Sequence, residues 1–269
     1  MKNLKYLALV ALATPALADP NATQQYEAMR QAYYQFDTHS LKSFTCHVDV
    51  SALDTMVTNL KQVLAAHADS TQIKDDLASY SLTVDAGTGL SINNPTLDIT
   101  LLNEKGMADP DRVKLGIQQS KQGFDAQVQG ADQIISGIFN NYLDVVPDLE
   151  SVTHQGDKWI VRYNLGGYET TDTIEGSHKH GESSNGPVSF VADSDYMALS
   201  GGKLALQKKV MQGTEGEQSL NTTTSVTYQK LGALYVPASI TSDNSLATSG
   251  VVETTTSNTI TFTGCSLKN

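Results

Sequence analysis

Residues 159–167 read Trp-Ile-Val-Arg-Tyr-Asn-Leu-Gly-Gly, and this stretch decides the fold class. Trp159, Val161, Tyr163 and Leu165 fall on every second residue, which is the period of a β-strand with one apolar face. The glycine pair at 166–167 then supplies a tight turn. Strands separated by such short turns pair as antiparallel hairpins, so the sequence predicts an antiparallel sheet in this half of the chain.

The same pattern continues to the C-terminus. Most of these strands carry Thr or Ser opposite their apolar face, which is typical of an antiparallel sheet with one solvated side. The apolar positions are Val188, Phe190, Ala192, Leu204, Leu206, Val210, Leu220, Val226, Tyr228, Leu234, Val236, Ala238, Ile240, Val252, Ile260 and Phe262. We find no internal repeat and no linker long enough to separate two domains.

The N-terminal half alternates between helix and strand. Apolar residues at helical spacing predict helices over 22–37, 52–67 and 109–146, the last beginning at an Asp-Pro-Asp start signal. Gly123 and Gly130 are places where this last segment can divide into two helices. Strands are predicted over 43–50, 80–86 and 97–101, the latter two as a pair. The helices are expected to cover the sheet, so the fold class is α+β.

The first eighteen residues have the pattern of a secretory signal peptide. Lys2 and Lys5 precede a short apolar run, and the small residues Ala16 and Ala18 occupy the positions that a signal peptidase reads. We expect cleavage before Asp19, which leaves one domain over 19–269 in the periplasm or outside the cell. No second apolar stretch reaches membrane length, so the mature chain is expected to be soluble.

The chain is acidic, with a formal charge of −11 that becomes −13 once Lys2 and Lys5 are removed with the signal. Nucleic acid and anionic membrane surfaces both attract cationic partners, so neither is an expected partner. The two cysteines, Cys46 and Cys265, lie near the two ends of the mature chain. In an oxidising compartment they are expected to form one disulfide, and two free buried thiols are the alternative.

The clearest polar cluster lies at residues 177–182, Ser-His-Lys-His-Gly-Glu. His178, His180 and Glu182 are on the same side of an extended segment and are candidates to ligate a divalent cation. The surrounding glycines favour the other interpretation, an exposed polar turn without a metal. No cofactor is expected.

Motifs of hydrolases and calcium loops are incomplete. The segment at 181–186 lacks the second glycine of a nucleophile elbow, and Ser200-Gly201-Gly202-Lys203 lies in a turn instead of at a helix start. The Asp-Ser-Asp at 193–195 lacks the later glycine and glutamate of a calcium loop. We therefore expect a protein that is not an enzyme.

Two segments resemble the periplasmic lipoprotein carrier (LolA-type) superfamily. One is Ser-Phe-Thr-Cys-His-Val at 43–48, which follows a predicted amphipathic helix; the other is the late segment at 226–240, with its Tyr, Gly and Pro. The resemblance implies a curved antiparallel half-barrel with amphipathic helices on its concave face and an apolar cavity that holds acyl chains.

These observations lead to a functional expectation. The chain is expected to bind a hydrophobic ligand, a lipid or acyl chain, in a cavity between sheet and helices. The candidate lining residues are Phe44, Val48, Phe124, Ile138, Trp159, Val161, Tyr163 and Phe190. The alternative is an envelope protein–protein interaction or sensor module with a filled core, and a third is a metal-binding or enzymatic protein centred on His178 and His180.

Overall fold

The computed structural model describes residues 20–33, 43–65, 70–85, 88–103, 109–139, 148–249 and 251–268. The predicted signal peptide lies outside these residues. The chain divides into two compact units. Unit 1 consists of Met1–Tyr34, Val145–Ser225 and Asp243–Thr256, and unit 2 consists of Gln35–Asp144, Val226–Ser242 and Ser257–Asn269. Because the units are interleaved along the chain, no linker in the sequence marks the division.

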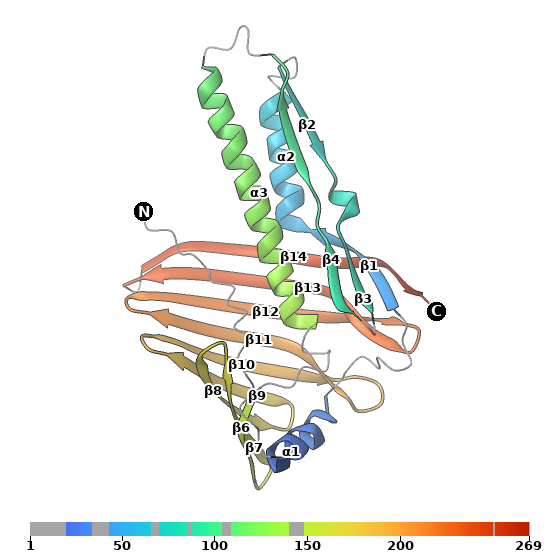
Figure 1. Cartoon of the computed structure of the whole chain (residues 1–269), viewed down its shortest axis with the longest axis vertical. Coiled ribbons are helices and arrows are strands. Elements are labelled where there is room, and N and C mark those ends of the chain that lie inside the picture. Colours follow the sequence, from blue (N-terminus) through green and yellow to red (C-terminus); the bar gives the residue numbers. More distant parts are fainter. Residues whose placement is uncertain are drawn as a thin grey trace. The chain divides into compact units, whose positions relative to one another are not determined.

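Helices and strands alternate in the N-terminal half, and strands fill the C-terminal half (Figure 1). The helices are α1 (Pro20–Arg30), α2 (Ser51–Ala65), α3 (Pro110–Phe139) and the short 3-10 helix η1 (Leu77–Ser79). The strands are β1 (Ser43–Val50), β2 (Thr71–Asp75), β3 (Ser81–Asp85), β4 (Gly89–Asn93), β5 (Leu97–Leu101), β6 (Asp148–Gln155), β7 (Lys158–Leu165), β8 (Tyr168–Glu175), β9 (His178–Asn185), β10 (Val188–Ala198), β11 (Leu204–Glu215), β12 (Gln218–Leu231), β13 (Leu234–Thr248) and β14 (Val251–Lys268).

The strands form one large sheet and one small one. Neighbours in the twelve-stranded sheet follow the order β4-β3-β1-β14-β13-β12-β11-β10-β9-β8-β7-β6, and β2 pairs with β5 in the two-stranded sheet. The pairs from β6 to β12, and those that β1 makes with β3 and β14, are antiparallel. The prediction of an α+β fold with an antiparallel sheet is therefore confirmed.

One predicted pairing is wrong. The strands expected at 80–86 and 97–101 correspond to β3 and β5, but they do not pair with each other. β3 pairs with β4, which directly follows it in a hairpin, and β5 pairs with β2. The sequence prediction missed β4, a five-residue strand that begins at Gly89. Because β4 comes directly after β3 in the chain, it is the nearest strand with which β3 can pair.

Unit 1 contains a meander with a period of ten residues. β6, β7, β8 and β9 are each eight residues long, and each is followed by a two-residue turn. These turns begin at Gly156, Gly166, Gly176 and Gly186, whose φ angles are +66°, +61°, +59° and +58°. Hairpin turns of two residues require this positive φ, which glycine adopts readily. The expectation of no internal repeat is therefore wrong, because the repeat lies in the turns instead of in the strand sequences.

Helix α1 packs against the sheet of unit 1, next to β6 (Figure 1). Its Met29 joins a core of four strand residues, Leu149, Val152, Val161 and Ile174. Tyr26, Tyr33, Trp159 and Tyr163 are partly buried around this core. Tyr26 and Met29 lie on α1 at the predicted helical spacing and cover this face of the sheet. The helix expected over 22–37 nevertheless ends at Arg30, and Tyr33 beyond it forms a bridge with Leu204.

In unit 2, α3 is one continuous helix of 30 residues, so Gly123 and Gly130 do not divide it. Its C-terminal half buries a row of apolar side chains: Phe124, Val128, Ala131, Ile135, Ile138 and Phe139. The ring of Phe139 lies 6.5 Å from that of Phe44 on β1 and 5.6 Å from that of Phe262 on β14. Packing of this row against the strands stabilises the helix across both glycines, since tertiary contacts outweigh helix propensity.

The disulfide between Cys46 and Cys265 is present, as predicted. It joins the neighbouring strands β1 and β14, where the register shifts between Thr45 and His47. Gly264, whose φ is +57°, lies in the same stretch of β14 and permits this irregularity. A disulfide fits the expected oxidising compartment. Among the described residues, none of the helices is long and apolar enough to cross a membrane.

Candidate functional site

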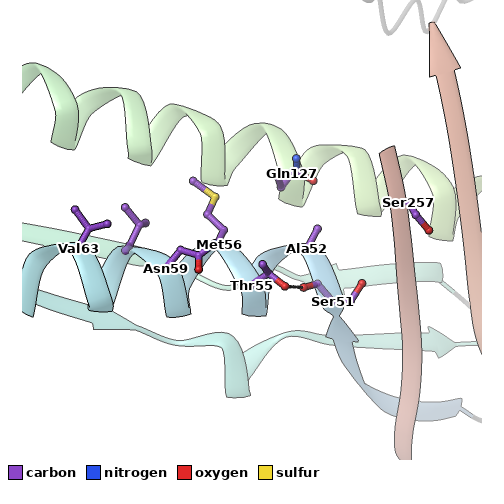
Figure 2. A pocket seen from close by; sticks show the side chains of 9 residues that line it. Ser51, Ala52, Thr55, Met56, Asn59, Val63, Gln127 and Ser257 are labelled. Atoms are coloured by element: carbon purple, nitrogen blue, oxygen red, sulfur yellow. Dashed lines mark hydrogen bonds between the residues drawn. The ribbon is translucent and has the colours of Figure 1, made fainter. Parts of the chain in front are cut away.

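A groove of about 600 Å³ runs along helix α2 in unit 2 (Figure 2). Its lining comes from α2, α3 and β14: Ser51, Ala52, Thr55, Met56, Asn59, Leu60, Val63, Gln127 and Ser257. Small-molecule sites in proteins have volumes of about 300–1,000 Å³ and mostly apolar walls. By size and lining, this groove is the candidate binding site of unit 2.

The sequence of α2 provides apolar side chains on more than one stripe. Leu53 and Val57 face the core and are buried. Ala52, Met56, Leu60 and Val63 follow at helical spacing and line the groove instead. Ala52, Met56 and Leu60 are partly buried, whereas Val63 is 68% exposed, so the far end of this second stripe is not covered by the rest of the described chain. A helix that needed only to cover its own sheet would not require it.

The two ends of the groove differ in polarity. At the start of α2, the side-chain oxygen of Asn258 accepts hydrogen bonds from the Ser51 hydroxyl (3.2 Å) and the Ala52 amide (3.3 Å). The Ser51 hydroxyl oxygen also accepts a hydrogen bond from the Thr259 amide at 3.0 Å. The Asn258 oxygen thus satisfies the Ala52 amide in the first turn of the helix, and the three contacts together anchor the start of α2 to β14. The other end, at Leu60 and Val63, is apolar.

Helix α3 forms the opposite wall. A β-carbon built on Gly123 would lie 3.2 Å from the terminal methyl of Met56, so the two helices approach closely at this point. Figure 2 shows the side chains of Met56 and Val63 directed from α2 toward α3. Methionine has a flexible, unbranched side chain that adapts to irregular gaps. Met56 can therefore change the shape of the groove without a movement of the helices.

Four of the predicted cavity residues belong to the core of unit 2 and not to the groove. Phe44 is fully buried, and Val48, Phe124 and Ile138 are between 1% and 5% exposed. Val48 also borders a smaller hollow of about 240 Å³ beside His47 and Asp49. In that hollow, burial and the neighbouring Asp49 carboxylate raise the pKa of Asp54.

The other four predicted cavity residues lie in unit 1. Val161 is fully buried, and the ring of Trp159 stacks on that of His154 at 4.2 Å. The Tyr163 hydroxyl donates a hydrogen bond to Asp172 at 3.0 Å. Phe190 borders a hollow of about 80 Å³, together with Val188, Leu220 and Leu246. The eight residues therefore belong to two separate units.

A polar cluster lies on the α1-facing side of the unit 1 sheet, and the sequence prediction did not identify it. The Lys179 ammonium group contacts the buried Asp172 carboxylate at 2.8 Å. Burial by itself lowers the pKa of Lys179, but the attraction of Asp172 outweighs it, so the pKa is raised. Tyr33 packs edge-on against Tyr196 at 4.8 Å, and its buried hydroxyl has no hydrogen-bond partner among the described residues. The sequence does contain a signal for this cluster, the turn glycines that recur every ten residues. They could have shown that β8, with Asp172, pairs with β9, with Lys179.

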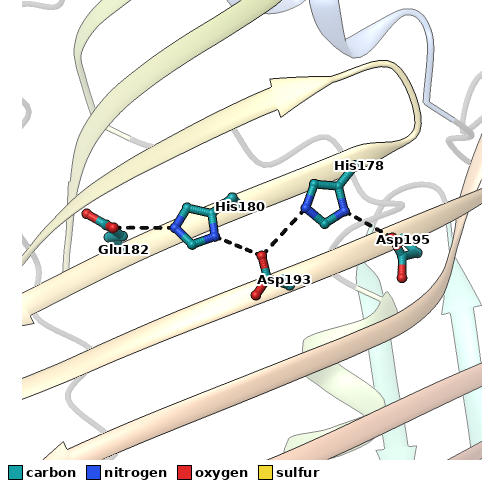
Figure 3. A network of polar contacts seen from close by, with 5 residues as sticks. All are labelled: His178, His180, Glu182, Asp193 and Asp195. Atoms are coloured by element: carbon teal, nitrogen blue, oxygen red, sulfur yellow. Dashed lines mark hydrogen bonds and ion pairs between the residues drawn. The ribbon is translucent and has the colours of Figure 1, made fainter.

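The histidine cluster of the sequence analysis lies on β9 and β10, on an exposed face of unit 1 (Figure 3). Asp193 contacts both rings, at 2.7 Å from Nδ1 of His180 and 3.5 Å from Nε2 of His178. Nδ1 of His178 lies 3.0 Å from Asp195, and Nε2 of His180 lies 3.3 Å from Glu182. Hydrogen bonds to Asp193 and Glu182 raise the pKa of His180.

These five side chains form a row of pairs and do not converge on one point (Figure 3). Within the part of the chain that the structure describes, no group of three or more His, Cys, Asp or Glu residues could hold a metal ion. The alternative interpretation of this cluster as an exposed polar turn is also wrong, because His178–Asn185 form strand β9 and only residues 176–177 are a turn. The arrangement can exchange protons with the solvent and stabilise the pairing of β9 with β10.

Comparisons with known proteins do not assign the chain to a group. No family model matches it, and neither a curated protein nor a solved structure does.

Proposed function

We propose that the protein is a non-enzymatic binding protein of the periplasm or extracellular space, and that it holds a hydrophobic ligand, a lipid or acyl chain, along α2. The observation that carries this proposal is the second apolar stripe of α2, which lines a groove of about 600 Å³ instead of the core. The LolA-type resemblance of residues 43–48 and 226–240 suggests the same ligand class.

The location differs from the cavity expected between sheet and helices. Phe44, Phe124, Ile138 and Val161 are at most 5% exposed, and their contacts are those of a close-packed core. A ligand in the groove needs no rearrangement of that core.

The polarity of the groove suggests how an amphiphile would lie in it. Its apolar tail would contact Met56, Leu60 and Val63, and its polar group would lie near Ser51 and Ser257, whose side chains line the other end. Burial of the tail drives binding at about 25 cal/mol per Å² of apolar surface removed from water. No covalent step is required.

Native mass spectrometry of the protein, purified gently from a bacterial periplasm, tests this proposal. We expect an added mass that organic solvent removes and that is identified as lipid. Leu60→Gln places an amide in the apolar wall and should abolish the added mass. Leu165→Gln in unit 1, where the side chain is already 62% exposed, is the matched control and should retain it. A wild-type protein that carries no lipid and retains none on titration would contradict the proposal.

The second candidate function is an envelope protein–protein interaction module. The filled cores of both units favour it, as do the exposed apolar side chains Val63, Leu102 and Leu115 of unit 2. Exposed apolar patches on a folded protein often mark surfaces that bind other proteins. Absence of lipid in the mass spectra, with the same protein folded and stable, would favour this candidate.

A further inference from the structure

The side chains that line the groove along α2 carry no charge. The polar ones are hydroxyls and amides: Ser51, Thr55, Asn59, Gln127 and Ser257. The single basic residue of α2, Lys61, is paired with Asp75 at 2.7 Å. On α3, the Lys121 ammonium group is paired with Asp98 at 2.9 Å. A ligand with a negatively charged head would therefore meet no counter-ion among the described residues that form the groove.

The start of α2 does not compensate for this lack of positive charge. Helix N-termini attract anions through their free amides and the helix dipole. In α2, however, the Ala52 amide already donates a hydrogen bond to Asn258, and Asp54 adds a carboxylate to the first turn. The whole chain has a formal charge of −11. A carboxylate at this end of the groove would thus meet like charge.

The polar side chains of the groove suit an uncharged head. Asn59, Gln127 and Ser257 are exposed at its surface, so their donors and acceptors are open to a ligand. Amides and hydroxyls both donate and accept hydrogen bonds. A glycerol head has hydroxyls that do the same, whereas a carboxylate only accepts and a quaternary ammonium group does neither.

Gln127 lies at the polar end of the groove. Helix α3 runs in the opposite direction to α2, and its Gly123 approaches Met56 (Figure 1). Gln127 follows four residues later, which is about one helical turn closer to the start of α2. Figure 2 shows it on the same side of the groove as Ser257 and away from Val63. Its amide is therefore placed to contact the head of a ligand.

We propose that the ligand of this groove is a single-chain amphiphile with an uncharged, hydroxyl-bearing head, of which a monoacylglycerol is the simplest case. The head would lie near Gln127 and Ser257, and the chain would lie along Met56, Leu60 and Val63. Removing an unpaired charge from water costs far more than removing a hydroxyl that keeps its hydrogen bonds. This inference rests on the proposed function and names the class of ligand.

The apolar part of the groove sets the length of the chain. From Met56 to Val63 the helix rises by about 10 Å. An extended alkyl chain with bonds of about 1.5 Å advances by about 1.25 Å per carbon, so about eight carbons span this distance. Val63 is 68% exposed at the open end, so a longer chain would leave the groove. Each methylene inside should strengthen binding by up to about fourfold, and each one outside should add little.

Isothermal titration calorimetry of the full chain with three probes of equal chain length is the test. The probes are 1-decanoylglycerol, decanoate and decyltrimethylammonium, each below its critical micelle concentration, at about pH 8 and about 0.15 M salt. We expect the glycerol ester to bind at least about tenfold more tightly than either ion. In a series of glycerol esters, affinity should rise with chain length and level off beyond about ten carbons.

Gln127→Lys and Gln129→Lys form a matched pair of variants. Both glutamines are exposed on α3, but Gln129 faces about 160° away from Gln127 and does not line the groove. Lysine is as good a helix former as glutamine, so neither change should disturb the fold. An ammonium group at 127 should improve the binding of decanoate relative to the glycerol ester by about tenfold, whereas one at 129 should leave the ratio unchanged.

The possible results separate this inference from the proposed function. If either ion binds the wild-type protein as tightly as the glycerol ester, the inference is overturned and the proposed function stands. The same follows if decanoate gains nothing in Gln127→Lys, or if both lysine variants shift the ratio equally, since the charge of the whole protein would then set the preference. Binding of none of the three probes would overturn the inference together with the proposed function.

Discussion

The disulfide between Cys46 and Cys265 gives the sharpest stability prediction. It closes a loop with a sequence separation of 219 residues. In the chain-entropy model, a loop of that length restricts the unfolded chain by about 5 kcal/mol, and measured values are about 2–5 kcal/mol. We therefore expect reduction of the folded protein to lower the free energy of unfolding of unit 2 by about 2–5 kcal/mol.

Two spectroscopic signals distinguish the units in this experiment. Unit 2 contains the long helices α2 and α3, so the far-ultraviolet circular dichroism of helix reports mainly on it. The single tryptophan, Trp159, lies in unit 1 and reports on that unit by fluorescence. With a slope of about 3 kcal/mol per molar urea, the helical transition should shift downward by about 0.7–1.7 M.

The double variant Cys46→Ala/Cys265→Ala should reproduce the effect of reduction. Cys46 is 1% exposed, and alanine leaves only a small space at this position. A loss of less than about 1 kcal/mol would refute the reasoning, because it would mean that the unfolded chain is no more restricted with the crosslink than without it.

Three further predictions concern individual contacts. Tyr80→Phe removes a 2.6 Å hydrogen bond to Asp132 and should cost about 1–3 kcal/mol in urea unfolding; an unchanged midpoint would contradict this. The raised pKa of His180 means that its stabilising contribution is complete below pH 6.5 and is lost as the pH rises above that value. Melting temperatures measured across this range should show that pH dependence, and His180→Gln should remove it. Gly181→Ala places a β-carbon 2.7 Å from Asp172, so it should lower the melting temperature, whereas Gly137→Ala should not.

The sequence predicts local structure well where one periodicity dominates. The strand at 43–50 has the predicted bounds, and α2 begins and ends within two residues of its prediction. The helix over 109–146 exists from Pro110 to Phe139, although its glycines suggested a division. Pairing is predicted less well, because alternation within a strand does not say which neighbour it joins. This is why β3 was assigned to β5 and β4 was missed.

None of the eight predicted lining residues lies in the groove along α2. Apolar residues at strand or helix spacing, such as Phe44 and Phe124, have the same pattern whether they pack in a core or line a cavity. The groove residues Met56, Leu60 and Val63 belong to the predicted stripe of α2, and only tertiary structure separates them from Leu53 and Val57.

The sequence by itself predicted the α+β class, the antiparallel strands and the pairing of Cys46 with Cys265. Residue period and turn glycines act locally, and a chain with two cysteines offers a single possible pairing. Only the tertiary structure decided the division into two interleaved units and the groove along α2. These depend on which strands meet and which helix face is left uncovered, and both are set by contacts between residues far apart in the chain.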